Sequence, residues 1–148
     1  MSRSRVVRVL KLSAVLFALC ASGPVSAQAA KKAPQFTDDF RLQDCTFSSV
    51  GANPYFIVQP GYQTVFKGLE DGVAVVNTIT VLNQTLELGG VETRVIEERE
   101  THDGQLAEVS LNYFAICTET NSVFYFGEDV DIYDGGVIVA HDGTWHHG

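Results

Sequence analysis

The sequence predicts an all-β domain, built as a single curved antiparallel β-meander of about six to eight strands. Three observations support this fold class. β-Branched and aromatic residues fill the runs between regularly placed glycines, no proline occurs from Tyr62 onward, and outside the first residues nothing has a sustained helical period. Because proline cannot donate to a ladder, a proline-free stretch of this composition is typical of a hydrogen-bonded sheet.

The first 27 residues resemble a secretory signal peptide. Residues 12–21 form an uncharged core, and Val25-Ser26-Ala27 is a small-residue cleavage site. A basic region precedes the core: Arg3, Arg5, Arg8 and Lys11. The apolar run breaks at residues 22–24, short of the roughly 20 residues that a spanning helix needs. We therefore expect cleavage after Ala27 or Ala29, a secreted or periplasmic product, and no stable membrane insertion afterwards.

Removal of the leader leaves a strongly acidic chain. The full chain has a formal charge of −8, and the leader contains four of its ten basic residues and none of its 18 acidic ones. Six basic residues against 18 acids give the mature chain a charge of −12. This charge repels phosphate backbones and anionic lipid, which argues against nucleic acid and anionic membranes as partners. Cationic ligands, metal ions and basic protein surfaces remain open.

Two cysteines remain in the mature chain, Cys45 and Cys117. An exported protein meets an oxidising environment, so we predict that they form a disulfide. The bridge would close a loop of about 70 residues, which stabilises a fold by roughly 4 kcal/mol. Its role would be structural, because no Cys-x-x-Cys pair is present.

The mature chain divides into an irregular part and a sheet. Residues 28–61 contain every mature proline, and we expect an irregular segment there that packs on the sheet. Residues 62–148 should form the antiparallel sheet domain. Its expected strands are 62–69, 73–82, 85–88, 91–101, 106–117, 123–126, 130–133 and 137–141. Their turns contain glycine, and Asp103-Gly104 is a pair favoured in two-residue type I′ loops.

The Asp103-Gly104 turn also predicts a register. Paired positions should sum to about 207. The predicted pairs are an exposed ion pair (Arg99 and Glu108), a core contact (Ile96 and Leu111) and a cation–π contact (Arg94 and Tyr113). Alternation along 106–117 predicts one buried face, which includes the disulfide: Ala107, Val109, Leu111, Tyr113, Ala115 and Cys117.

Two groups of side chains have metal-ligand chemistry. Three carboxylates lie near glycines, as Ca²⁺ sites require: Asp129, Asp131 and Asp134. Their spacing misses the EF-hand pattern by one residue and lacks its bidentate Glu, so a solvated strand edge is the alternative. Three histidines suit zinc or copper, or are incidental near the chain end: His141, His146 and His147. No cofactor is expected.

Catalytic signatures are lacking in the sequence. It contains no Gly-x-Ser-x-Gly elbow, no His-Glu-x-x-His pair and no phosphate-binding glycine loop. We therefore expect a non-enzymatic protein.

Aromatic residues exceed the needs of a minimal core, which suggests an apolar ligand on the concave face of the sheet. The candidate ligand-binding residues are Tyr55, Phe56, Phe114, Phe124 and Phe126. Plain core packing explains the same residues. The expected partner is therefore a small apolar ligand or a protein.

The C-terminus suggests a second function class. Asp142-Gly143 is a hairpin turn signal, but the returning strand at Trp145 has hardly begun where the sequence stops. Either the chain is the N-terminal part of a longer architecture, or a partner chain completes an open sheet edge. The alternatives to ligand binding are therefore an envelope assembly protein that pairs through this edge and a Ca²⁺- or Zn²⁺-dependent module.

Four motifs resemble a group of uncharacterised secreted bacterial β-rich proteins. They are Asn53-Pro54-Tyr55-Phe56 with Pro60-Gly61, then residues 90–95 (GVETRV), residues 125–130 (YFGEDV) and Gly143-Thr144-Trp145. The likeness covers most of residues 44–145. It implies a fold type and a compartment, and it transfers no catalytic or ligand residue.

Overall fold

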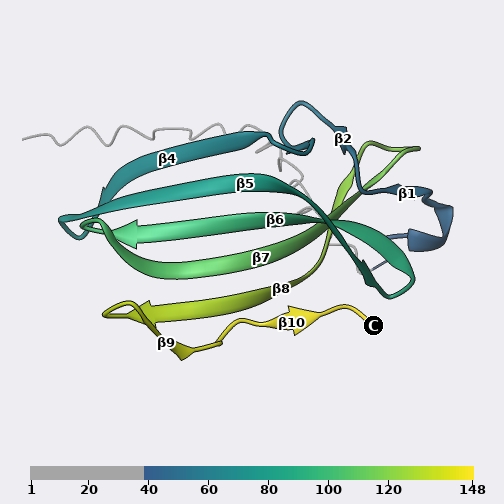
Figure 1. The fold of residues 1–148 in the computed structure, drawn as a ribbon. Helices are drawn as coiled ribbons and strands as arrows, with labels where there is room; N and C mark the ends of the chain where they lie inside the picture. The colour runs from purple at the N-terminus through teal and green to yellow at the C-terminus, as the bar shows by residue number, and fades with distance from the viewer. Residues whose placement is uncertain (1–38) are drawn as a thin grey trace, which may run out of the picture. The chain divides into compact units, whose positions relative to one another are not determined.

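The computed structural model describes residues 39–148, and this part of the chain is all-β (Figure 1). The predicted leader and residues 28–38 lie outside the described residues. Among residues 39–148, no helix is long and apolar enough to cross a membrane. The elements are η1 (Leu42–Asp44), β1 (Phe47–Ser48), β2 (Gly51–Ala52), β3 (Ile57–Val58), β4 (Gln63–Glu70), β5 (Val73–Leu88), β6 (Val91–His102), β7 (Gln105–Cys117), β8 (Val123–Asp134), β9 (Val137–Ala140) and β10 (Trp145–His146).

Eight of these strands form one open antiparallel sheet, which confirms the predicted meander. Its order is β10-β8-β7-β6-β5-β4, with β1 beside β7 and β9 beside β8. β2 and β3 form a separate two-stranded sheet. The part of the expected irregular segment that is described, residues 39–61, contains only elements of two or three residues.

Two-residue turns place consecutive strands next to each other in the sheet. Four hairpins close at Asp71-Gly72, Gly89-Gly90, Asp103-Gly104 and Gly135-Gly136, and both residues of each turn have a positive φ. This is type I′ geometry, whose twist matches that of the flanking strands. The structure therefore confirms the turn chemistry expected at Asp103-Gly104.

Two strands are longer than predicted. Residues 73–82 and 85–88 belong to one strand, β5, with a register shift between Val81 and Thr85. Residues 123–126 and 130–133 likewise belong to β8, where Phe126 has no partner between the Tyr113–Gly127 and Phe114–Tyr125 pairs. These irregularities are β-bulges, which bend a strand without ending it.

The predicted register of the β6–β7 hairpin holds only next to the turn, where Thr101 pairs with Leu106. Beyond it, Glu100 pairs with Glu108, so Ala107 is an extra residue and every later pair shifts by one. The three predicted pairs are therefore wrong: the partners of Arg99, Ile96 and Arg94 are Val109, Asn112 and Phe114. A one-residue shift also reverses faces, so Arg94 lies on the opposite face from Tyr113.

The hydrophobic core lies on the face predicted from β7. Val95, Tyr113, Ala115 and Phe126 form a buried cluster, and Phe47 packs against it. Burial of the other residues on the predicted β7 face varies along the strand. Cys117 is fully buried, whereas Ala107, Val109 and Leu111 are partly buried. The opposite face of β7 is buried as well, at Ser110, Asn112 and Ile116. The sequence pattern did not indicate this second buried face.

Residues 45–61 start at the core face, where Phe47 packs, and then cross to that second face, where Gly51 lies against Ile116 and Phe56 against Phe114. A disulfide joins Cys45 to Cys117, as predicted, with a Cα–Cα distance of 5.1 Å. β1 then pairs with the end of β7. At Gly51 the backbone is so close to Ile116 that an added Cβ would lie 2.7 Å from its Cγ2 atom. Beside the disulfide, hydrogen bonding from Thr46 lowers the pKa of Glu119, whose carboxylate accepts the Thr46 N–H at 2.8 Å.

Candidate ligand-binding site

A groove of about 320 Å³ lies on this second face, between the N-terminal segment and strands β4, β5 and β6. We call it the aromatic groove. None of its lining residues is charged: Pro54, Tyr55, Phe56, Ile57, Tyr62, Thr64, Phe66, Ile79, Val81 and Ile96. Cross-strand pairing places the strand residues on one face of the sheet, because Thr64 pairs with Ile79 and Val81 pairs with Ile96.

A local turn builds one wall of the groove. The Asn53 side-chain oxygen accepts the backbone N–H groups of Tyr55 and Phe56, each at 2.8 Å. This is the chemistry by which asparagine stabilises turns. Tyr55 is left 95% exposed, while the Phe56 ring packs on Phe114 at a centroid distance of 4.9 Å. Phe114 in turn stacks on Tyr125 at 4.6 Å.

The floor and outer rim of the groove differ in character. Val81 and Ile96 form a floor that is nearly inaccessible to solvent, at 3% and 2% exposure. Tyr62 and Phe66, on the rim, are 44% and 59% exposed. Large apolar side chains are therefore held open to solvent above a closed aliphatic floor, with tyrosine and threonine hydroxyls as the side-chain polar groups. This arrangement suits a neutral, apolar ligand.

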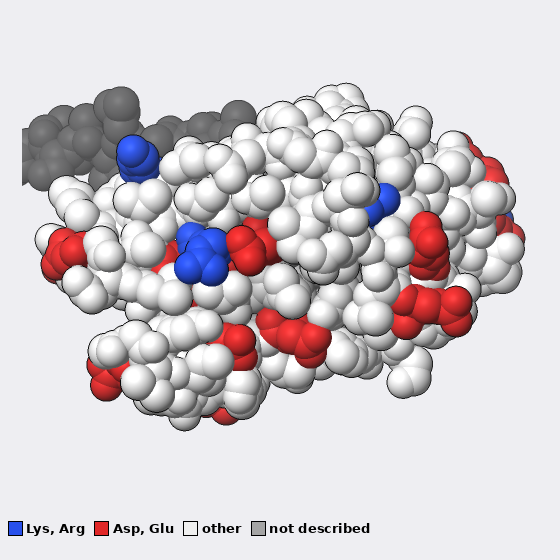
Figure 2. Space-filling view, viewed as in Figure 1, with Lys and Arg blue, Asp and Glu red and all other residues white. Residues whose placement is uncertain are grey.

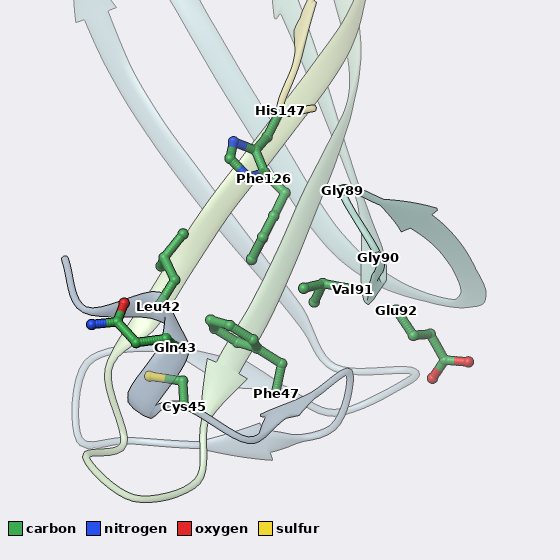
Figure 3. A pocket seen from close by; sticks show the side chains of 10 residues that line it. All are labelled: Leu42, Gln43, Cys45, Phe47, Gly89, Gly90, Val91, Glu92, Phe126 and His147. Atoms are coloured by element: carbon green, nitrogen blue, oxygen red, sulfur yellow. The ribbon is translucent and has the colours of Figure 1, made fainter. Parts of the chain in front are cut away.

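A second cavity, of about 500 Å³, lies at the tip of the β5–β6 hairpin (Figure 3). Leu42, Phe47, Val91 and Phe126 line it together with His147, while the Glu92 side chain points away from the other labelled side chains. Phe47, Val91 and Phe126 also complete the hydrophobic core. This cavity therefore borders one end of the core.

The structure separates the five predicted ligand residues into two groups. Tyr55 and Phe56 line the aromatic groove, and Phe114 supports Phe56 from below. Phe124 and Phe126 lie on the other face, where each meets the Phe47 ring edge-on at 5.3 Å. Core packing thus accounts for Phe124 and Phe126. Sequence reasoning missed Tyr62 and Phe66, although both follow the alternation of β4.

The predicted metal ligands form separate pairs. His146 Nε2 lies 2.9 Å from Asp129 Oδ1, and His141 Nδ1 lies 2.8 Å from Asp131 Oδ1. His147 instead packs against Phe126, with ring centroids 5.6 Å apart. Asp134 ends β8 beside the turn into β9.

The described residues contain one cluster of three ligand-type groups that approach one another closely enough to share an ion: Cys45, Cys117 and Glu119. Its two sulfur atoms form the disulfide and are not available to a metal. The calcium and zinc hypotheses remain predictions, and the pairing of the acids with histidines does not favour them.

Partly buried polar groups lie beside the groove, on the same face of the sheet. The Tyr125 hydroxyl donates to the Asn112 side-chain oxygen at 2.6 Å, and burial, followed by the nearby Glu128 carboxylate, raises the pKa of Tyr125. Burial also raises the pKa of Glu108, with further contributions from neighbouring carboxylates. These contacts join neighbouring strands beside the groove.

Comparisons of the chain with protein-family models, with curated proteins and with solved structures gave no match.

Proposed function

We propose that the protein is a secreted, non-enzymatic binding protein that holds a small apolar ligand in the aromatic groove. The observation that carries this proposal is the exposure of Tyr55, Tyr62 and Phe66 around an uncharged cavity. Exposed aromatic side chains that converge on a concave site are typical of binding surfaces, because a monomer gains nothing from leaving them in water.

The charge of the chain supports a neutral ligand. The acidic residues that lie on the same face of the sheet, among them Glu70, Glu98 and Glu128, are not part of the lining of the groove. Anionic amphiphiles would be repelled by the mature charge of −12, whereas an uncharged chain or ring would not. The Cys45–Cys117 disulfide is compatible with an oxidising compartment, which supports secretion or export to the periplasm.

The test is a fluorescence titration of the exported, disulfide-bonded protein with N-phenyl-1-naphthylamine, a neutral apolar dye. Thr64 lies within the groove and Thr78 on the opposite face of the sheet, where it pairs with Val65. Thr64→Trp should fill the groove and weaken dye binding about tenfold or more, equivalent to a loss of about 1.4 kcal/mol. Thr78→Trp, the matched control, should leave the affinity within about twofold.

A second variant tests the rim. Tyr55→Ser should weaken dye binding several-fold without lowering the melting temperature, because this side chain is 95% exposed. Phe40→Ser removes an aromatic ring of 62% exposure outside the groove and should change neither property. Equal dye affinity of wild type, Thr64→Trp and Tyr55→Ser would show that the groove is not the binding site.

A further inference from the structure

β4 is an edge strand with few of the features that protect sheet edges. It pairs with β5 on one side, and no described strand pairs with its other side. Natural edges are usually shielded by prolines, bulges or covering loops. β4 contains no proline, and the β4–β5 ladder has no register shift, whereas the other ladders longer than two residues each have one.

Three side chains of β4 are both apolar and exposed. Val65, Phe66 and Leu69 are 47%, 59% and 77% exposed. Its charged residues, Lys67 and Glu70, cancel each other, so the edge is neutral in a chain whose mature charge is −12. Figure 2 shows the same contrast on one face: acidic side chains lie mainly over the lower strands, and the rim along β4 and β5 is mostly uncharged. This edge is therefore where two copies can approach with little repulsion.

The register of the hairpin determines which backbone groups of β4 point away from β5. Glu70 and Val73 flank the two-residue turn, and Val81 N–H donates to the Tyr62 carbonyl at 2.9 Å. Backbone groups alternate in direction along an antiparallel strand, so the even-numbered residues of β4 face β5. The odd-numbered residues direct their N–H and C=O groups outward: Gln63, Val65, Lys67 and Leu69.

We propose that β4 pairs antiparallel with β4 of a second copy of the chain, about a two-fold axis at Phe66, so that the two sheets become continuous. The outward N–H and C=O groups of one copy must meet the outward groups of the other copy. This requirement limits the two-fold axis to a few residues of β4. An axis at Lys67 sets two lysines opposite each other, and an axis at Val65 reduces the pairing to residues 63–67. An axis at Phe66 pairs residues 63–69 of both copies.

The axis at Phe66 also matches the side chains. The two Phe66 rings face each other in a non-hydrogen-bonded pair, where cross-strand side chains approach most closely. Lys67 lies opposite the second copy's Val65, so its charge meets no other charge directly. Thr64 and Phe66 line the aromatic groove, so the grooves of the two copies would adjoin across the axis. The pairing itself does not depend on whether the groove holds a ligand.

The first test is sedimentation velocity of the exported, disulfide-bonded chain from about 1 μM to about 1 mM, which spans weak and moderate affinities. We expect the mass to rise towards twice the monomer value. Val65→Pro removes an outward N–H and leaves the bonds to β5 intact, so it should fold and remain monomeric. Val65→Thr, the matched control, keeps the N–H and should associate as wild type does.

The second test is oxidative cross-linking, which does not rely on Val65→Pro being folded. Cysteines at opposite non-hydrogen-bonded positions lie about 4.5–5.5 Å apart at Cβ, close to disulfide distance. Phe66→Cys should give a dimer linked through residue 66. Glu70→Cys, equally on the edge but distant from its counterpart, should not.

Three outcomes overturn the proposal. The first is a wild-type chain that stays monomeric at the highest concentration. If such a chain instead binds an extended peptide at this edge, the partner of β4 is a foreign strand and the proposal is also wrong. The second is a folded Val65→Pro variant that still associates, because the interface then lies outside the β4 edge. Cross-linking through residue 70 rather than 66 refutes the register.

Discussion

Arg94 offers a sharp test of how the segment before the sheet is held. Its side chain is only 6% exposed, and no carboxylate of the described residues lies within ion-pair distance of it. Its guanidinium instead donates to the carbonyl of Ser49 at 2.9 Å and to that of Gln84 at 3.0 Å. Arg94 thus joins the N-terminal segment to the β5 bulge. Arg94→Met would remove these two bonds and two longer ones, to the Leu82 carbonyl at 3.4 Å and the Ser49 hydroxyl at 3.5 Å.

The expected cost follows from these contacts. Hydrogen bonds to a charged group contribute about 1.5–3 kcal/mol each, so two good ones give about 3–6 kcal/mol. Folding of the methionine variant does not require dehydration of a charge, which offsets part of this loss, but the carbonyls of Ser49, Leu82 and Gln84 lose the Arg94 donor. We therefore expect a loss of about 3–4 kcal/mol, a large share of the roughly 5–15 kcal/mol that stabilises a typical domain.

Urea unfolding followed by tyrosine and tryptophan fluorescence measures this loss. With a slope of about 2 kcal/mol per M, the midpoint should fall by about 1.5–2 M. Arg99→Met is the matched control, since Arg99 is exposed on the same strand, and it should change stability by less than about 0.5 kcal/mol. Arg94→Lys keeps the charge but not the fork of the guanidinium, so its urea midpoint should lie between those of Arg94→Met and Arg99→Met. Equal midpoints for Arg94→Met and Arg99→Met would refute the assigned role.

Three further predictions concern stability. Gly127 has φ 144°, and an added Cβ would lie 2.9 Å from the backbone Cα of His146. Gly127→Ala should therefore lower the free energy of unfolding in urea by about 1–3 kcal/mol. Gly68→Ala, with open space around the added Cβ, should lower it by less. Replacing Cys45 and Cys117 by alanine opens a loop with a sequence separation of 72 and should cost about 4 kcal/mol; a loss below about 1 kcal/mol would contradict the loop-entropy argument. The raised pKa of Glu108 means that ionisation disfavours the folded state, so its contribution to stability falls as the pH rises through the raised pKa. Glu108→Gln should therefore raise the melting temperature at pH 7 and leave it unchanged below the unfolded pKa; an equal rise at both would exclude ionisation as the cause.

Much of the fold could be predicted because its determinants are local. The dipeptides Asp71-Gly72 and Asp103-Gly104 adopt the positive φ values of type I′ turns, and such turns pair the strands on either side. The bulges at Ala107 and Phe126 were not predictable in the same way. A bulge bends its strand and increases the local twist, and the sequence pattern of one strand does not show where the packed sheet requires that bend.

The candidate site shows the same limit. Tyr55 and Phe126 are both aromatic residues in β-rich sequence, yet one is 95% exposed at the groove and the other 3% exposed in the core. Their difference depends on where the N-terminal segment crosses the sheet. That path is set by β1 pairing with β7 and by Arg94, neither of which is a neighbour of the groove in sequence.

The sequence by itself determined the fold class, the turns, most strand positions and the Cys45–Cys117 pair, because each depends on backbone preferences or on a count of residues. Only the tertiary structure decided the register beyond the first bulge, the second buried face and the residues of the groove. These depend on the twist of the sheet and on contacts between distant segments, and a shift of one residue in a strand moves every side chain to the other face.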